Sequence, residues 1–446
     1  MFRILFVVSC LVNSICLFLL SFACNVPNVP KIANYFGTKS RYEEVNPYLI
    51  NDINAVNESL VKPPSPGCQA VHLSAIIRHG TRFPTTNNIR RMRKFHDLVI
   101  SLAASNDSCV QQIKTWNMWY TDDMDGRLVR KGRKDLWHLA VRLTKSFPSL
   151  LTEENLREGR IKFITSSKHR CVNSTIAFKE GLADTLHTSD SNVEYIINDA
   201  LMRFFDQCLR FVEKSKAAAV EVDNFKSGAH MRRVQEKIAD RLQIPYGNIT
   251  NDMVEAAFYL CSYEFSIKGE SSPWCQLFDE VDAKTIEYAG DLKHYWKKGY
   301  GHDINSKSSC ILFQDLFSRL DKAAQERRSG EQLSEVVTVQ VGHAETLLPL
   351  LTLLGFFKDN EQLTATNFDK QDGRAFRTSH IMPYAANLLV TLYDCPEGFR
   401  LQFRLNEKPL TLPGIADPAP TYQAVREHYS ILLSGCDQET VCKLSK

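Results

Sequence analysis

Excess charge of either sign, internal repeats and low-complexity tracts are all missing from this sequence of 446 residues. Its 54 basic and 51 acidic residues leave a formal net charge of +3, which is too small for nucleic-acid binding by bulk electrostatics. No nucleic-acid partner is therefore expected, and an anionic ligand must be recognised locally. The composition of 44% hydrophobic and 24% charged residues argues against disorder and predicts a large globular core.

Long apolar runs are also scarce, and the only one lies among the first residues. The run from Ile4 to Phe22 follows a basic Arg3 and ends in Ser21-Phe22-Ala23, whose small residues fit a cleavage site. We predict that residues 1–23 are a signal peptide removed after Ala23, and an uncleaved membrane anchor is the alternative. No second run is comparable, so no stable membrane span is expected after signal removal.

The thirteen cysteines lack the CxxC spacing of common metal sites. Ten of them follow Cys24, and this even, scattered number favours disulfides over a metal. Cys261 with Cys275, and Cys436 with Cys442, are close enough in sequence to close short loops. We expect these two pairings, while the rest of the connectivity stays open.

Potential glycosylation sites agree with an oxidising compartment. The sequence contains four Asn-x-Ser/Thr sequons, at Asn57, Asn106, Asn173 and Asn248. The C-terminus has neither an ER-retrieval tetrapeptide nor the apolar tail of a lipid-anchor signal. The expected location is the secretory pathway, with secretion, the ER lumen or a lysosome-like compartment as destinations.

Strand and helix patterns alternate in two parts of the chain, which predicts an α/β fold with a mostly parallel central sheet flanked by helices. Residues 68–190 together with 311–446 form this predicted core. Residues 191–310 are helix-like and polar, so we interpret them as an inserted α-helical cap subdomain. Residues 24–67 are rich in Asn, Pro and Ser and predict an extended N-terminal arm. The expected strands are 71–77, 161–165, 335–341, 383–393 and 399–405, and the expected core helices are 88–104, 132–147, 172–182 and 347–354.

The strongest chemical signal is the segment Arg78-His79-Gly80-Thr81-Arg82-Phe83-Pro84, which follows the first predicted strand. A neutral imidazole can attack phosphorus and so divide phosphate-ester hydrolysis into two easier steps. Planar, permanently charged guanidinium groups can balance the charge of the transferring phosphoryl group. A basic surface turn is the alternative explanation of an isolated Arg-His-Gly.

This segment resembles the R-H-G-x-R-x-P signature of the histidine phosphatase superfamily at every fixed position. The resemblance assigns the nucleophile to His79 and phosphate binding to Arg78 and Arg82. The stretch 165–171 is similar to the family segment that supplies a third phosphate-binding arginine, and this similarity assigns that role to Arg170. A basic helix start is the alternative interpretation of Arg170.

A second element, Gly342-His343-Ala344-Glu345-Thr346, resembles the His-Ala-Glu element of the multiple inositol polyphosphate phosphatase branch. Most histidine acid phosphatases have His-Asp at this point. By analogy His343 holds the transferred phosphate and Glu345 protonates the departing alkoxide, which is a poor leaving group without a proton. Glu345 should then be protonated at first, with a pKa raised by burial beside a polyanion. A capping pair at a helix start is the alternative.

Further cationic side chains could bind the other phosphates of a polyphosphate, although each could equally belong to a solvated face. The candidates are Lys168, Lys293, Lys297 and Lys298. Three of these lie in the stretch 291–301, where basic and aromatic residues alternate in a way that is similar to the inositol polyphosphate branch.

The resemblance extends from about Cys68 to Cys395 and implies a phosphoglycerate mutase-like α/β domain with a helical cap. It also implies hydrolysis of inositol polyphosphates through a phosphohistidine, with inositol hexakisphosphate as the leading substrate and with no cofactor and no metal. The alternatives are a broad-specificity secreted histidine acid phosphatase, a bisphosphoglycerate phosphatase, or an inactive anion-binding protein. Retention of the nucleophile, the arginines and the acid argues against the last of these.

Overall fold

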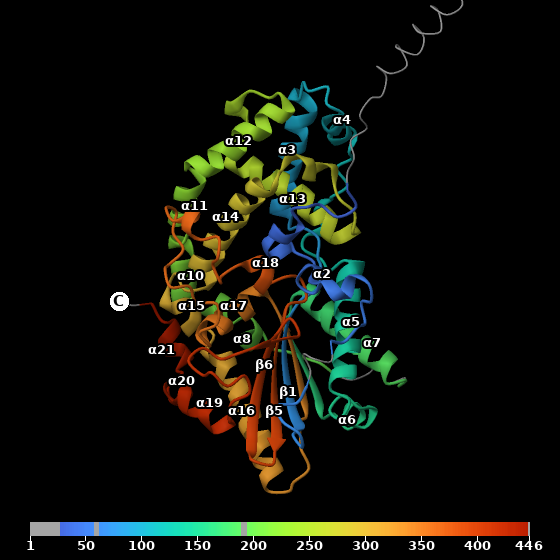
Figure 1. Ribbon diagram of the computed structural model, residues 1–446, viewed down its shortest axis with the longest axis vertical. Helices are drawn as coiled ribbons and strands as arrows, with labels where there is room; N and C mark the ends of the chain where they lie inside the picture. The colour runs from blue at the N-terminus through green and yellow to red at the C-terminus, as the bar shows by residue number, and fades with distance from the viewer. Residues whose placement is uncertain (1–26, 58–61, 189–193, 445–446) are drawn as a thin grey trace, which may run out of the picture.

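The computed structural model describes residues 27–57, 62–188 and 194–444, so the predicted signal peptide lies outside the described residues. Within these ranges seven strands form one sheet in the order β3-β2-β4-β1-β5-β6-β7 (Figure 1). Their bounds are β1 Gln69–Arg78, β2 Ile161–Thr165, β3 Ile196–Ile197, β4 Val337–Gly342, β5 Asn387–Cys395, β6 Gly398–Leu405 and β7 Lys408–Leu410.

The sheet is mixed, and the α/β class expected from the sequence is confirmed. Strand β4 pairs in parallel with β1 and with β2, and β2 pairs in parallel with β3. The second half folds back: β5 runs antiparallel to β1, and β6 and β7 continue the antiparallel pairing. Cys395 pairs with Gly398 across the β5–β6 turn, which is far too short for the crossover that a parallel connection needs.

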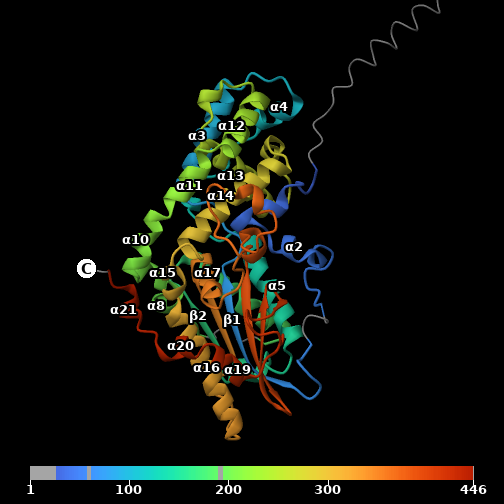
Figure 2. The ribbon, with the colours of Figure 1, turned by 60° about the vertical axis from the view of Figure 1, so that its left-hand side comes forward.

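Helices cover both faces of the sheet (Figures 1 and 2). The side chains of β1 alternate: Leu73, Ala75 and Ile77 pack with α5 and α7, whereas Ile76 belongs to the cluster that contains α16 and α17. Because both faces are covered, β1 is buried from Val71 onward, including its polar residues His72 and Ser74. The helices that flank the sheet are α5 Arg130–Ser146, α6 Glu153–Arg157, α7 His169–Thr185, α16 Cys310–Arg328, α17 Ala344–Leu353 and α19 Tyr422–His428.

A helical layer stands beyond one end of the sheet, at the top of Figures 1 and 2. Most of it comes from the range predicted to be helical, although the short β3 adds an edge strand to β2. Helices α3 and α4 come from an earlier part of the chain and also join the layer, where α3 packs on α13. The layer contains α3 Thr86–Leu102, α4 Ser108–Thr115, α11 Ala219–Lys226, α12 Ala229–Leu242, α13 Asn251–Lys268 and α14 Glu280–Lys298. Helices α8 Asp199–Met202, α9 Phe204–Gln207, α10 Leu209–Ala217 and α15 Asp303–Lys307 lie lower, where α8 contacts β4 and both α9 and α15 contact α17.

The segment predicted to be an extended arm is instead compact over residues 27–57. It forms the short helical turns η1 Ala33–Tyr35, η2 Gly37–Lys39, α2 Tyr42–Val45 and η3 Pro47–Ile50. Ile32, Phe36 and Leu49 are buried, and the ring of Phe36 meets those of Phe258 and Phe265 edge-on at 5.4 and 5.9 Å. The prediction of an extended conformation was wrong because composition gave no weight to these isolated apolar residues.

Four disulfides join described cysteines: Cys68–Cys395, Cys208–Cys442, Cys261–Cys275 and Cys310–Cys436. The Cys261–Cys275 pairing is confirmed, whereas Cys436–Cys442 is wrong. Cys442 instead bonds Cys208 just before α10, and Cys436 bonds Cys310 at the start of α16, because α21 (Gln438–Cys442) packs on α10 and α15. Cys109 is also disulfide-bonded, and Cys171 is a buried free thiol, so the even count did not mean that every cysteine pairs.

Three of the four sequon asparagines, Asn57, Asn106 and Asn248, are exposed. Asn173 is half-buried in α7, and its Nδ2 donates a hydrogen bond to the carbonyl of His169 at 2.9 Å. Among the described helices, none combines the length and the apolarity needed to cross a membrane.

Candidate active site

The site lies where three neighbouring parallel strands end. His79 follows β1 and His343 follows β4, and these strands are paired so that Arg78 lies beside Gly342. The two imidazole rings are therefore brought within 5.7 Å of each other, centroid to centroid. The third strand, β2, leads through Ser166 to Arg170 in the first turn of α7. Ligand sites of α/β proteins form at such carboxyl ends of strands.

The imidazole of His79 is held in a single tautomer. Its Nδ1 lies 2.9 Å from the carbonyl oxygen of Gly80, which can only accept a hydrogen bond, so Nδ1 carries the proton. Burial, together with the charges of Arg78 and Arg170, lowers the pKa of His79 well below its usual value. The ring is therefore neutral, and its unprotonated Nε2 is free to act as a nucleophile.

The three arginines predicted to bind phosphate converge on this histidine. Arg78 donates from Nη1 to the carbonyls of Thr38 (2.9 Å) and Met382 (2.6 Å), and burial lowers its pKa to about 10. Arg82 donates from Nη1 to the carbonyl of Phe83 at 2.7 Å. The Nε atoms of Arg78 and Arg170 are buried without a hydrogen-bond partner among the described residues. Such donors are suited to an anion.

His343 is fixed by two contacts. Its Nδ1 accepts from Nη2 of Arg170 at 3.3 Å, so the proton is on Nε2, which donates to Oγ of Ser166 at 2.9 Å. Burial and the charge of Arg170 lower the pKa of His343 to about 3. The ring is therefore neutral, and it contacts the guanidinium group of Arg170.

The loop that carries His79 rests on the start of α5, and two glycines allow this close approach. A Cβ on Gly80 would lie 2.2 Å from the carbonyl oxygen of Gly132, and a Cβ on Gly132 would lie 2.0 Å from that of Thr81. The N and Oγ1 of Thr81 both donate to Oδ2 of Asp135, at 2.9 and 2.6 Å. The Gly80 amide donates to Oγ of Ser174 at 3.1 Å. The loop is thus held in place before any ligand binds.

A cavity of about 580 Å³ opens above His79, between the sheet and the helical layer. Most of the residues predicted for the site line it: Arg78, His79, Arg82, Arg170, Lys293, Lys297, Lys298 and Glu345. Lys168 does not line this cavity; it is exposed and directly precedes α7.

Positive charge dominates the cavity. The lining includes eight basic side chains, at Lys39, Arg78, Arg82, Arg170, Lys216, Lys293, Lys297 and Lys298. It includes only two carboxylates, those of Asp206 and Glu345, so six positive charges are in excess. Arg203 neutralises Asp206 at 2.5 Å, which strengthens the imbalance. A cavity of this charge favours a polyanion.

Sequence reasoning missed the contribution of the N-terminal segment. The carbonyl of Thr38 holds Arg78, and the next residue, Lys39, reaches into the cavity with its Nζ 4.5 Å from the ring centre of Tyr259. Burial and the nearby Lys293 lower the pKa of Lys39 to about 7. No local pattern signals this role, since Lys39 precedes the motif by about forty residues and meets it only through the fold.

The ionisation of Glu345 in the empty site differs from the protonated state that is expected beside a polyanionic substrate. Glu345 lies in the first turn of α17, and its Oε1 is 2.6 Å from Nζ of Lys298, the last residue of α14. Burial raises the pKa of Glu345, but the charge and the hydrogen bond of Lys298, together with smaller contributions from His343 and the backbone, hold the pKa well below its usual value. The side chain is therefore a carboxylate in the empty site.

Comparison with known proteins agrees with this geometry. Residues 71–408 match the family model of the histidine phosphatase superfamily (branch 2). The chain belongs to this superfamily. It is 45% identical over 438 residues to multiple inositol polyphosphate phosphatase 1 of Gallus gallus, covering 95% of this chain and 97% of that protein. The human protein of the same name is 43% identical over 447 residues, covering 94% and 91%.

Solved structures of phosphatases share the fold of this histidine phosphatase. The phytase of D. castellii superposes with a TM-score of 0.73 at 16% identity, covering 92% of this chain and 87% of that one. The multiple inositol polyphosphate phosphatase of Bifidobacterium longum, in complex with inositol hexasulfate, gives a TM-score of 0.67 at 15% identity, covering 85% and 93%.

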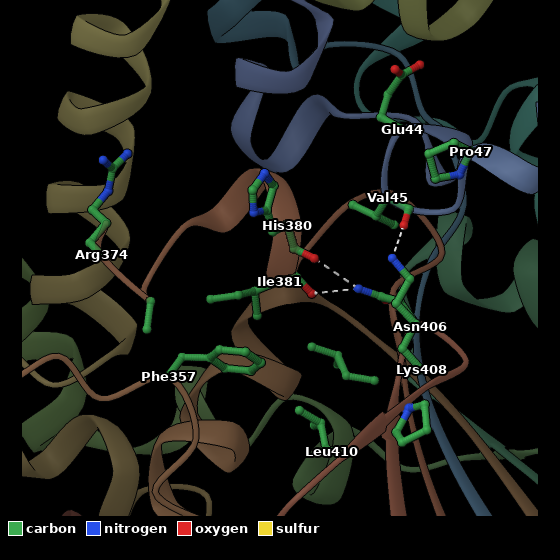
Figure 3. Close-up of a pocket in the computed structure, with 13 residues that line it drawn as sticks. Glu44, Val45, Pro47, Phe357, Arg374, His380, Ile381, Asn406, Lys408 and Leu410 are labelled. Atoms are coloured by element: carbon green, nitrogen blue, oxygen red, sulfur yellow. Dashed lines mark hydrogen bonds between the residues drawn. The ribbon is translucent and has the colours of Figure 1, made fainter. Parts of the chain in front are cut away.

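A second cavity of this histidine phosphatase, of about 670 Å³, lies beside the N-terminal segment (Figure 3). It lacks the motif residues, and two of its polar side chains already bind backbone carbonyls. Lys408 donates to the carbonyl of Val45, and Nδ2 of Asn406 donates to the carbonyls of His380 (3.1 Å) and Ile381 (3.4 Å). The smaller cavity above His79 is the candidate active site.

Proposed function

We propose that this histidine phosphatase hydrolyses the phosphomonoesters of inositol polyphosphates, from inositol hexakisphosphate to lower forms, through a phosphohistidine. The observation that carries this proposal is the excess of six positive charges around the His79 cavity. One phosphomonoester carries at most two negative charges, so a single phosphate would leave most of the lining uncompensated. The names of the chicken and human relatives, and the inositol hexasulfate bound to the Bifidobacterium enzyme, support the same substrate class.

In the proposed reaction, Nε2 of His79 attacks phosphorus while the ester bond to the inositol oxygen breaks. The three arginines hold the equatorial oxygens, where charge accumulates, and His343 joins them when its Nε2–H turns from Ser166 to the phosphate. Glu345 gives its proton to the departing oxygen. In the second half, water attacks the phosphohistidine and Glu345 takes up the proton that the water loses. The catalytic pair is His79 with Glu345, and the phosphate-binding groups are Arg78, Arg82, Arg170 and His343.

Phosphates that do not react are proposed to bind along α14 and the N-terminal segment. Lys293 and Lys297 lie one helical turn apart on α14, and both line the cavity. Neither has a carboxylate within ion-pair distance among the described residues. Lys39 faces them from η2.

Purified protein tests this function directly, with inositol hexakisphosphate, a bisphosphoglycerate and an aryl phosphate as competing substrates. We expect kcat/KM to be highest for inositol hexakisphosphate and to be abolished by His79→Ala. Equal kcat/KM for all three substrates would favour a broad acid phosphatase. Repeating the assay with a chelator tests metal independence.

The role of Glu345 is tested by Glu345→Gln. Its turnover of inositol hexakisphosphate should fall much more than its turnover of a nitrophenyl phosphate, whose leaving group needs little proton assistance. Equal losses with the two substrates would argue against Glu345 as the acid.

The proposed location is the secretory pathway. Disulfides persist in oxidising compartments, and three of the sequon asparagines are exposed to a glycosyltransferase. Treatment of the secreted protein with an endoglycosidase should lower its mass, and an unchanged mass would contradict glycosylation.

A further inference from the structure

The ion pair between Lys298 and Glu345 joins the two layers that enclose the cavity. Lys298 is the last residue of α14 in the helical layer, and Glu345 lies in the first turn of α17, which flanks the sheet. Both line the cavity, and their side chains are 13% and 36% exposed. A substrate that enters between the layers therefore meets this pair directly.

This contact conflicts with the reaction unless it changes on binding. A general acid must carry a proton, but a carboxylate 2.6 Å from an ammonium is held in its ionised form. A phosphate dianion beside Lys298 would compete for the same ammonium, because phosphate oxygens are strong acceptors of charge-assisted hydrogen bonds. The same dianion repels the carboxylate and favours its protonation.

We propose that Lys298 couples substrate binding to protonation of the acid: it pairs with Glu345 in the empty site and turns to a substrate phosphate when one binds. This inference rests on the proposed function. One proton from solvent then converts the Glu345 carboxylate to the acid. That proton passes to the inositol oxygen as the phosphorus–oxygen bond breaks and the bond from Nε2 of His79 to phosphorus forms. Lys298 is thus a positioning residue for the acid.

Other charged groups face Glu345 from every neighbouring element, and none of them makes the same contact. They are the neutral imidazoles of His294 on α14 and His343 before α17, and the guanidinium groups of Arg78 at the end of β1, Arg82 in the loop that follows it and Arg170 on α7. Among the described residues, only Lys298 pairs with Glu345 within 4 Å. The neighbouring Lys297 lines the same cavity without that contact and provides a matched control.

Proton uptake on binding measures this coupling without turnover. The probe is inositol hexasulfate, because its sulfate esters stay ionised and cannot contribute protons. Calorimetric titration near pH 6, in two buffers of different ionisation enthalpy, gives the protons taken up per site. We expect the wild-type protein to take up more protons than Glu345→Gln, by up to one per site. Equal uptake by the two proteins would overturn the proposal.

The pH dependence of kcat/KM tests the part played by Lys298. In the free enzyme, Lys298→Met removes the ammonium, so the pKa of Glu345 should rise on the order of one to two units. The fall of kcat/KM at high pH, measured with inositol hexakisphosphate, should therefore shift to higher pH by the same amount. Lys297→Met removes an equal charge from the cavity and should leave this fall at its original pH. A fall that stays at its original pH in Lys298→Met, or shifts equally in both variants, contradicts the coupling.

The two proposals fail in different ways. If inositol hexasulfate does not bind the wild-type protein, the proposed substrate class is wrong. If it binds but Glu345 contributes no proton uptake, the function stands and the coupling is wrong. Binding of the probe to each variant also shows that the variant is folded.

Discussion

Replacement of Lys39 by methionine should impair the hydrolysis of inositol hexakisphosphate in a pH-dependent way. The pKa of Lys39 is lowered to about 7 by burial and by Lys293, so the ammonium is present below that pH and lost as the pH rises through it. About nine tenths of the side chains are charged at pH 6 and about one tenth at pH 8. A hydrogen bond to a charged group contributes roughly 1.5–3 kcal/mol, which corresponds to about tenfold or more in affinity.

The assay compares initial rates of the two proteins between pH 5.5 and 8.5. We divide kcat/KM of the wild-type protein by that of Lys39→Met. Ionisation of the substrate affects both values equally, so it cancels in this ratio. We expect a ratio of about ten or more near pH 6 that falls toward one above pH 8, with a midpoint near 7. An aryl phosphate has a single phosphate, which must lie at His79 to react, so its ratio should stay near one.

Lys39→Arg is the matched control, since its guanidinium stays charged throughout this range. At pH 8, Lys39→Arg should therefore still have a higher kcat/KM for inositol hexakisphosphate than Lys39→Met. A ratio that does not change with pH, or that is equally large for the aryl phosphate, would refute the assignment of Lys39 to a remote phosphate.

Two further changes test how the site is supported. Gly132→Ala places a Cβ 2.0 Å from the carbonyl oxygen of Thr81, so the loop must shift, and kcat/KM should fall about a hundredfold in a chain that still folds. Gly290 in α14 is the control, because nothing lies within 4 Å of its Cβ position and alanine should be accepted there without loss of activity. Equal activities of the two variants would contradict the argument. Glu407→Gln removes the negative charge that pairs with buried Arg142 at 2.7 Å and should lower the free energy of unfolding by about 3 kcal/mol, measured by urea denaturation. An unchanged midpoint would show that this charge contributes nothing to stability.

The core strands could be predicted because they are short segments rich in apolar and β-branched residues, although polar residues interrupt them. Strand β2 begins and ends where the pattern places it, at Ile161 and Thr165. Helices α5 and α7 begin two or three residues before the predicted starts, within the usual uncertainty of helix ends. The motif residues at the ends of β1 and β4 meet because parallel strands in register deliver their carboxyl ends to one edge.

The remaining features depend on contacts between distant parts of the chain. The two-residue strand β3 exists only as a partner of β2, and Lys39 enters the cavity only because Phe36 packs against α13. The two C-terminal cysteines pair with residues 126 and 234 positions away, and sequence spacing carries no information on such distances. The ionised Glu345 follows from one ammonium on another helix.

Trapping the covalent intermediate decides whether His79 is the nucleophile. Inositol hexakisphosphate is mixed with the protein in a rapid-quench instrument, the reaction is stopped with base, which preserves phosphohistidine, and the peptides are analysed by mass spectrometry. The geometry predicts one phosphoryl group, on the ring of residue 79, that forms and decays fast enough to account for kcat. Full activity in His79→Ala, or a phosphoryl group on a different residue that turns over at kcat, would contradict it.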